Sequence, residues 1–299
     1  MSWTFETLAE FPNLLEGPLW DGSGLLFTEC DASRIHRYDP TTGRCTVYRE
    51  GTNKANGLLL GADGALYACE GEGRRVVRYD GSTTTVVADG YDGGRLNSPN
   101  DLVSDGQGRI WFSDPRYGPH WDDLELGHES VYRADPHRDG GWSLTRVTFD
   151  TTRPNGVLLS ADERTLYVAQ SEYGEGKMRE LWAYPIAEDG SLGPRRVLHT
   201  FYPHRGIDGM CLDSVGNIVA TAGWRESGPG PMIYVFAPDG RVLEQHPVPV
   251  DRPTNCTWGE DDLRTLYVTT GSGYLLRART DRQGHPRYRP PATTDEVAT

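Results

Sequence analysis

A phrase that returns six times along the 299-residue chain is the strongest constraint on its fold. Each copy places a turn residue, usually glycine, before a short apolar stretch, as in Gly64–Tyr67. The copies are centred on Leu26, Leu66, Ile110, Leu166, Ile218 and Leu266. Successive centres are 40, 44, 56, 52 and 48 residues apart. A period of this length is typical of repeat architectures, and it is the length of one four-stranded propeller blade.

The residues inside one period indicate short strands joined by tight turns. In the second copy we expect strands over Ala65–Cys69, Arg75–Tyr79 and Thr84–Ala88, with a turn at Asp80-Gly81 between the last two. These segments are rich in β-branched and aromatic residues, and none has a sustained helical period. A two-sheet sandwich would use similar strands, but it would not need six matching phrases. The sequence therefore predicts an all-β, six-bladed propeller.

The two ends of the repeat array indicate how the ring closes. The sixth copy provides strands over Thr265–Thr270 and Tyr274–Thr280 and then lacks its outer strand, whereas Ser2–Phe11 is strand-like and belongs to no blade. Because an unpaired edge favours aggregation, we expect the N-terminal strand to complete the last blade. We expect one propeller domain over residues 1–289, and a disordered tail over residues 290–299.

Composition excludes several classes of protein. The chain has 43 acidic and 30 basic residues, a net charge of −13, and no basic stripe, which argues against nucleic acid and anionic membranes as partners. Neither a membrane-spanning apolar run nor a signal peptide is recognisable. Five cysteines without a C-x-x-C pair argue against a disulfide framework or a thiolate zinc site. We expect a soluble cytoplasmic protein, monomeric or a small homo-oligomer.

One polar residue recurs ten or eleven positions before each apolar centre. These residues are Glu16, Asn56, Asn100, Asn155, Asp208 and Asn255. Since innermost strands surround the channel of a propeller, residues in matching register would form a ring near one mouth. Two carboxylates among four amides favour an oxygen-ligated cation such as Ca²⁺, Mg²⁺ or Mn²⁺ over structural zinc. The alternative is that these residues only form turns, which suits Asn and Asp but not Glu.

Five motifs resemble those of a known family. They are Glu16–Trp20, Asn97–Val103, Trp111–Gly118, Arg153–Leu158 and Ile207–Asp213. Together they resemble the gluconolactonase/regucalcin family, also called the senescence-marker-protein family, over roughly Glu16 to Thr280. Animal members have an arginine two residues before the asparagine that matches Asn100, where this chain has Ser98. The chain is therefore more similar to the microbial gluconolactonase-like branch.

The resemblance implies a six-bladed propeller that holds one divalent cation and hydrolyses sugar lactones. By position, the family's metal ligands fall on Glu16, Asn155 and Asp208, and its substrate-binding asparagine on Asn100. The resemblance also implies that Asp208 acts on the attacking water, and the glycine after it would leave room for close approach. The expected cation is Ca²⁺, with Zn²⁺, Mn²⁺ and Mg²⁺ as alternatives.

The loop after the third copy carries further candidates for substrate binding. Asp114 and Tyr117 are suited to hydrogen-bond sugar hydroxyls, Arg116 to bind a carboxylate, and Asn56 joins them from the ring. The alternative for the loop is a rigid, proline-rich connector. Weaker candidates of the same kind are Glu172-Tyr173, His204-Arg205, Trp224-Arg225 and Glu70.

These observations predict a metal-dependent hydrolase that opens a sugar or related small lactone. A cation would polarise the carbonyl while Asp208 assists the attacking water. In one alternative, the same metal site hydrolyses a phosphotriester or another ester instead of a lactone. A second alternative is a non-catalytic propeller that binds a metal or a protein partner, because fold alone does not define function.

Overall fold

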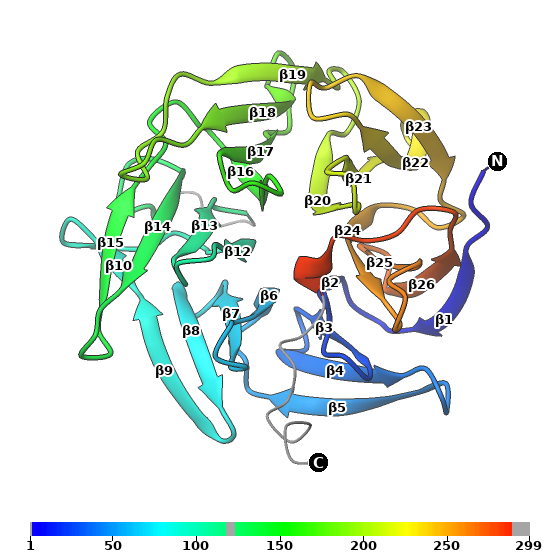
Figure 1. Ribbon diagram of the computed structural model, residues 1–299, viewed down its shortest axis with the longest axis horizontal. Helices are drawn as coiled ribbons and strands as arrows, with labels where there is room; N and C mark the ends of the chain where they lie inside the picture. Colours follow the sequence, from blue (N-terminus) through cyan, green and yellow to red (C-terminus); the bar gives the residue numbers. More distant parts are fainter. Residues whose placement is uncertain (1, 118–122, 289–299) are drawn as a thin grey trace.

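The computed structural model describes residues 2–117 and 123–288, and six four-stranded antiparallel sheets surround a central channel in it (Figure 1). The six-bladed propeller predicted from the repeat is confirmed. The first three blades are β2 (Leu15–Trp20), β3 (Leu25–Glu29), β4 (Arg34–Asp39) and β5 (Arg44–Glu50); β6 (Ala55–Leu60), β7 (Leu66–Glu70), β8 (Arg75–Asp80) and β9 (Thr83–Ala88); and β12 (Leu102–Ser104), β13 (Ile110–Asp114), β14 (Ser130–Pro136) and β15 (Trp142–Arg146).

The other three blades repeat this order from the channel outward. They are β16 (Pro154–Leu159), β17 (Thr165–Ser171), β18 (Arg179–Pro185) and β19 (Arg196–Thr200); β20 (Ile207–Leu212), β21 (Ile218–Trp224), β22 (Ser227–Phe236) and β23 (Val242–Pro247); and β24 (Pro253–Gly259), β25 (Thr265–Thr270), β26 (Tyr274–Arg279) and β1 (Glu6–Glu10). A small hairpin, β10 (Gly90–Tyr91) with β11 (Gly94–Arg95), lies outside the blades. A short 3₁₀ helix, η2 (Pro286–Tyr288), lies near the centre of the ring in Figure 1.

The N-terminal strand closes the ring, as predicted. β1 pairs antiparallel with β26, with Thr7 opposite Leu276, so the last sheet contains both ends of the array. The strand begins only at Glu6 because Trp3 is held elsewhere. Its indole stacks on His246 of β23 with ring centroids 3.9 Å apart, and its Nε1–H donates to Asp281 at 3.0 Å. Residues 290–299, the predicted tail, lie outside the described residues.

The core lies between neighbouring blades, where their sheet faces meet. Trp111, Trp182 and Trp258 on the third, fourth and sixth blades are fully buried. Replacing a tryptophan buried in this way by alanine costs about 3–5 kcal/mol. No helix among the described residues is long and apolar enough to cross a bilayer.

A bulge interrupts most innermost strands next to the residue that the sequence placed in the ring. The register shifts between Glu16 and Leu19 in β2, and at the matching point of β6, β16, β20 and β24. Such bulges re-aim side chains. A glycine follows the ring residue in four blades, where the next blade approaches closely. A Cβ on Gly17 would lie 2.2 Å from the carbonyl oxygen of Asn56, and one on Gly156 would lie 2.4 Å from that of Asp208.

Candidate active site

A cavity of about 430 Å³ opens at the end of the channel where the innermost strands begin. Its lining residues are Leu14, Glu16, Asn56, Asn100, Tyr117, Asn155, Tyr173, Arg205, Asp208, Trp224, Arg252, Thr254 and Gly271. They come from the starts of innermost strands and from the segments that follow second strands, which meet on one face. This volume lies within the usual range for small-molecule sites. Five of the six ring residues therefore share one cavity, as their common register predicts.

Two buried carboxylates form the floor of this cavity. Glu16 is 4% exposed and Asp208 is 9% exposed. One Asp208 oxygen accepts a hydrogen bond from Asn155 Nδ2 at 2.6 Å, and the other forms an ion pair with Arg205. Glu16 accepts the N–H of Gly17 at 3.1 Å and has no ion-pair partner among the described residues. The floor thus contains two acids and one cation.

Burial raises the pKa of both acids. Desolvation raises the pKa of Glu16 well above its ordinary value, and the nearby charge of Asp208 adds to this effect. Desolvation likewise raises the pKa of Asp208, while Arg205 and Asn155 act in the opposite direction. Such a pair is costly in a dry site unless a cation lies near it.

These residues fit a divalent cation by the chemistry of their donors. Glu16 and Asp208 supply two anionic oxygens whose repulsion a cation would relieve, and rotation of the Asn155 amide would present Oδ1 as a third oxygen. Within the described part of the chain, no three His, Cys, Asp or Glu side chains group closely enough to hold a metal. The proposed site has only two carboxylates, so the amide oxygen of Asn155 is essential as the third ligand.

The glycine after Asp208 has a different role from the one expected. The sequence suggested that Gly209 leaves room for a ligand. A Cβ there would instead lie 2.1 Å from the Asn255 side chain, so Gly209 accommodates the neighbouring blade. This packing holds the β20 backbone, and with it Asp208, in a fixed position against β24.

Aromatic side chains form the walls. The Tyr117 hydroxyl accepts a hydrogen bond from Asn155 at 3.0 Å, and its ring lies 5.5 Å from the Arg153 guanidinium carbon. Tyr173 and Trp224 face each other with ring centroids 6.3 Å apart. Both residues were weaker candidates in the sequence, as was Arg205. No local signal identified Leu14, Arg252, Thr254 or Gly271, which reach the cavity only through the ring geometry.

Two predicted substrate-binding residues have other partners. Asp114 is fully buried and accepts the N–H groups of Asn97 and Ser98, both at 2.8 Å. Arg116 forms an ion pair with Asp123 at 2.6 Å. Neither belongs to the cavity lining found among the described residues. Both side chains thus have partners within the protein close to Tyr117, and their part in substrate binding stays a prediction.

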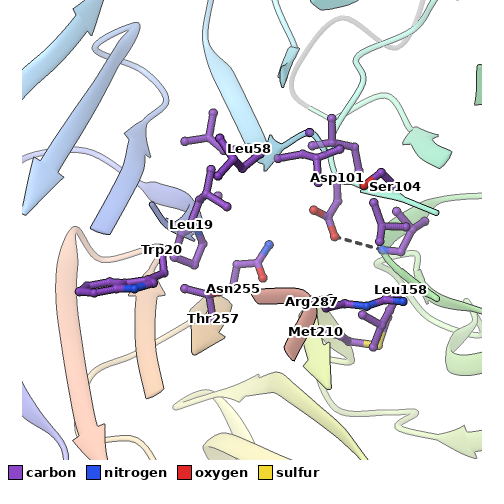
Figure 2. Close-up of a pocket in the computed structure, with 18 of the residues that line it drawn as sticks. Leu19, Trp20, Leu58, Asp101, Ser104, Leu158, Met210, Asn255, Thr257 and Arg287 are labelled. Atoms are coloured by element: carbon purple, nitrogen blue, oxygen red, sulfur yellow. Dashed lines mark hydrogen bonds between the residues drawn. The ribbon is translucent and has the colours of Figure 1, made fainter. Parts of the chain in front are cut away.

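A second cavity, of about 370 Å³, occupies the opposite end of the channel (Figure 2). Its lining is largely apolar, including Leu19, Leu58 and Met210. Asn255, the sixth ring residue, lies here and not with the other five, because it precedes the paired residue Cys256 by one position, whereas Asn155 and Asp208 precede Val157 and Met210 by two. Asp101 accepts the N–H of Val157 at 3.1 Å, and burial raises its pKa to about 7. This cavity has no acidic pair like that of the first.

Fold and site together define a six-bladed propeller with an acidic polar site at one mouth of its channel. Residues 14–272 match the family described as SMP-30/gluconolactonase/LRE-like region, and the chain belongs to that family. It is 32% identical to a gluconolactonase of Zymomonas mobilis, over 95% of this chain and 83% of that protein.

Two other relatives are similar to this chain over most of its length. A pentonolactonase, XacC, of Haloferax volcanii is 30% identical over 86% of this chain and 81% of its own length. The solved structure of a gluconolactonase from Xanthomonas campestris is 33% identical with a TM-score of 0.79, covering 93% of this chain and 89% of that one. The expectation of a gluconolactonase-like family, reached from the motifs, is therefore confirmed.

Proposed function

We propose that this protein is a metal-dependent hydrolase that opens the ring of a sugar lactone, with Glu16, Asn155 and Asp208 holding the cation. By homology it is a gluconolactonase-like lactonase. The observation that carries the metal assignment is the pair of buried, mutually repelling carboxylates beside an amide on the cavity floor. The donors are all oxygens, so Ca²⁺ is the expected cation, ahead of Mg²⁺, Mn²⁺ and Zn²⁺.

A lactone needs its carbonyl polarised and a water activated. When bound, the cation supplies the Lewis acidity that polarises the carbonyl. Asp208 is the proton acceptor of the proposal, because burial raises its pKa and so makes its carboxylate a better base near neutral pH. Arg205 and Asn155 hold one Asp208 oxygen each, which fixes the carboxylate plane.

The remaining lining residues orient the substrate. Asn56 and Asn100 offer amide donors and acceptors from two neighbouring blades, and the Tyr117 hydroxyl adds a third group. Polar side chains on separate blades define the orientation of a polyhydroxylated ring, while Tyr173 and Trp224 cover its apolar face. Water enters from the open end of the cavity.

The test is a pH-indicator assay over aldono-, uronic and aliphatic lactones, with simple esters and a phosphotriester included. Chelator-treated protein receives Ca²⁺, Mg²⁺, Mn²⁺ or Zn²⁺ singly. We expect lactone turnover that chelation abolishes and one cation restores. Turnover of the phosphotriester alone, or no turnover with any cation, would reject the proposal.

Two variants test whether Asp208 is the proton acceptor. Asp208→Ala removes both a ligand and the proton acceptor, so its activity should fall more than tenfold, on the order of 10²–10⁴ for loss of a general base. The control is Asp135→Ala, which removes a carboxylate that pairs with Arg133 away from the cavity, and should behave as wild type. Activity of Asp208→Ala within tenfold of wild type would show that this assignment is wrong.

A further inference from the structure

The rim of the first cavity carries a cation that the proposed reaction has not used. Arg252 is exposed and lines this cavity, whereas Glu16 and Asp208 are buried on its floor. Its guanidinium donates to the Gly271 carbonyl at 3.2 Å, and it has no ion-pair partner among the residues described. Since arginine carries five N–H donors, most of its fork remains available to a ligand.

The two arginines of the cavity differ in this respect. Arg205 is buried, pairs with Asp208, and donates to the carbonyl oxygens of Gly223 at 3.2 Å and Pro253 at 3.0 Å. Its charge is therefore balanced within the protein, and its donors are used. Arg252 is the cation of the cavity lining that has no carboxylate partner among the described residues.

The local backbone holds Arg252 in place. Its backbone N–H donates to Asp251 at 3.0 Å, and its carbonyl accepts the N–H of Gly271 at 2.7 Å. A Cβ on Gly271 would lie 3.3 Å from the Arg252 Cβ and 3.5 Å from its Nε. Because Gly271 has no side chain, the Arg252 side chain can pack against the backbone just after β25. These contacts place the guanidinium group at the rim of the cavity.

We propose that the substrate is a lactone that carries an anionic oxygen group, such as a carboxylate, at the end remote from its ester, and that Arg252 binds this group. The inference rests on the proposed function. A molecule whose ester lies over the buried carboxylates extends toward the rim, where the planar guanidinium fork matches a carboxylate. The chain's net charge of −13 disfavours anions in general, so their retention needs a local cation at the site.

The experiment compares the five-membered lactones of gluconic and glucaric acid, which differ only in a terminal hydroxymethyl group or carboxylate. We expect the wild-type KM for the glucaric lactone to be lower by about fivefold, the size of one partly exposed ion pair. In Arg252→Gln this difference should disappear, because the KM for the glucaric lactone rises toward that for the gluconic lactone. Arg252→Lys should retain part of it, because the charge remains.

The matched control is Arg241→Gln, which removes an exposed charge from the turn between β22 and β23 and should preserve the difference. A second readout needs no turnover: calorimetric binding of open-chain glucarate and of the neutral alditol glucitol to chelator-treated protein. Glucarate should bind more tightly than glucitol to wild type, and equally weakly to Arg252→Gln.

The outcomes separate this inference from the proposed function. Equal KM values in wild type, or a difference that survives in Arg252→Gln, would overturn the role of Arg252 and leave lactone hydrolysis intact. Absence of turnover with both lactones and every cation would overturn the proposed function. In that case, glucarate binding that Arg252→Gln does not weaken would overturn the anion site as well.

Discussion

Replacing Glu16 by glutamine tests the cation site without relying on activity. Glu16 is the carboxylate that lacks an ion-pair partner among the described residues, and Asp208 raises its pKa further. Glutamine keeps the shape and the acceptor for the Gly17 N–H. It removes one of the two anionic oxygens that attract a cation. In chelator, Glu16→Gln should unfold at the wild-type temperature or above it, because a buried repulsion is lost.

The expected magnitude follows from linkage. A cation at 100 times its dissociation constant stabilises the folded state by about 2.7 kcal/mol. The unfolding entropy of a 299-residue chain is roughly 0.6 kcal/mol per kelvin, from about 2.1 cal/mol/K per residue. The wild-type Tm should therefore rise by about 4 °C. Substituting a residue that only supports a metal ligand lowers the metal affinity by about 10–100-fold. Loss of the ligand itself should therefore lower the affinity by at least about 100-fold and reduce the cation-induced rise in Tm to below about 1 °C.

Thermal unfolding followed by circular dichroism measures these shifts with and without each cation. Glu29→Gln is the matched control, because Glu29 is equally buried but accepts from Asn13 at 2.8 Å and pairs with His36 at 2.9 Å. It should lower the Tm in chelator and leave the cation shift intact. A full shift in Glu16→Gln, or a loss of the shift in Glu29→Gln, would refute the assignment of Glu16 as a ligand.

Three further predictions concern the surroundings of the site. Gly156→Ala should destabilise the fold by about 1–3 kcal/mol and weaken cation binding, because its Cβ would press on the Asp208 carbonyl; denaturant unfolding and the cation shift measure both. Asp101 has a folded pKa of about 7, above its unfolded value near 4, so its proton stabilises the fold at low pH and this contribution is lost as pH rises from about 4 to 7. Asp101→Asn should flatten that decline by up to about 1.4 kcal/mol per pH unit in chelator, and an unchanged slope would contradict the burial argument. Tyr117→Phe loses the hydroxyl that contacts Asn155, so its kcat/KM should fall about 5–10-fold, the equivalent of one hydrogen bond, at an unchanged Tm.

The fold was predictable because its determinants are local and repeated. The turn-plus-strand phrase returns in every blade, and the missing outer strand of the last blade predicted the role of β1. The exact start of β1 was not predictable, since it depends on Trp3 stacking against His246 some 240 positions away in the chain. A period in the sequence defines which strands pair, but not which side chains leave a strand for a distant partner.

In the candidate site too, the residues that follow the repeat were predictable, and those that depend on the closed ring were not. The ring residues share a register because each begins an innermost strand, so a count along the sequence placed five of them in one cavity. Asn255 broke the rule because it stands one position later in its strand than Asn155 and Asp208 do in theirs, and Thr254 takes the matching place in the cavity. Arg252 lies three positions before Asn255, as Arg205 lies three before Asp208, but only the closed ring brings both arginines to one cavity.

The floor and the rim of the cavity should change differently in evolution. The floor depends on bulges and on glycines that contact the next blade's backbone, so a change at Gly156 or Gly209 disturbs two blades at once. The rim depends on segments between strands, where a substitution such as Arg252→Gln alters one side chain and leaves every sheet paired. Catalytic chemistry should therefore be shared by relatives with this repeat, while substrate preference varies with the rim. Relatives with an uncharged residue at the position of Arg252 should therefore lack the preference for an anionic lactone.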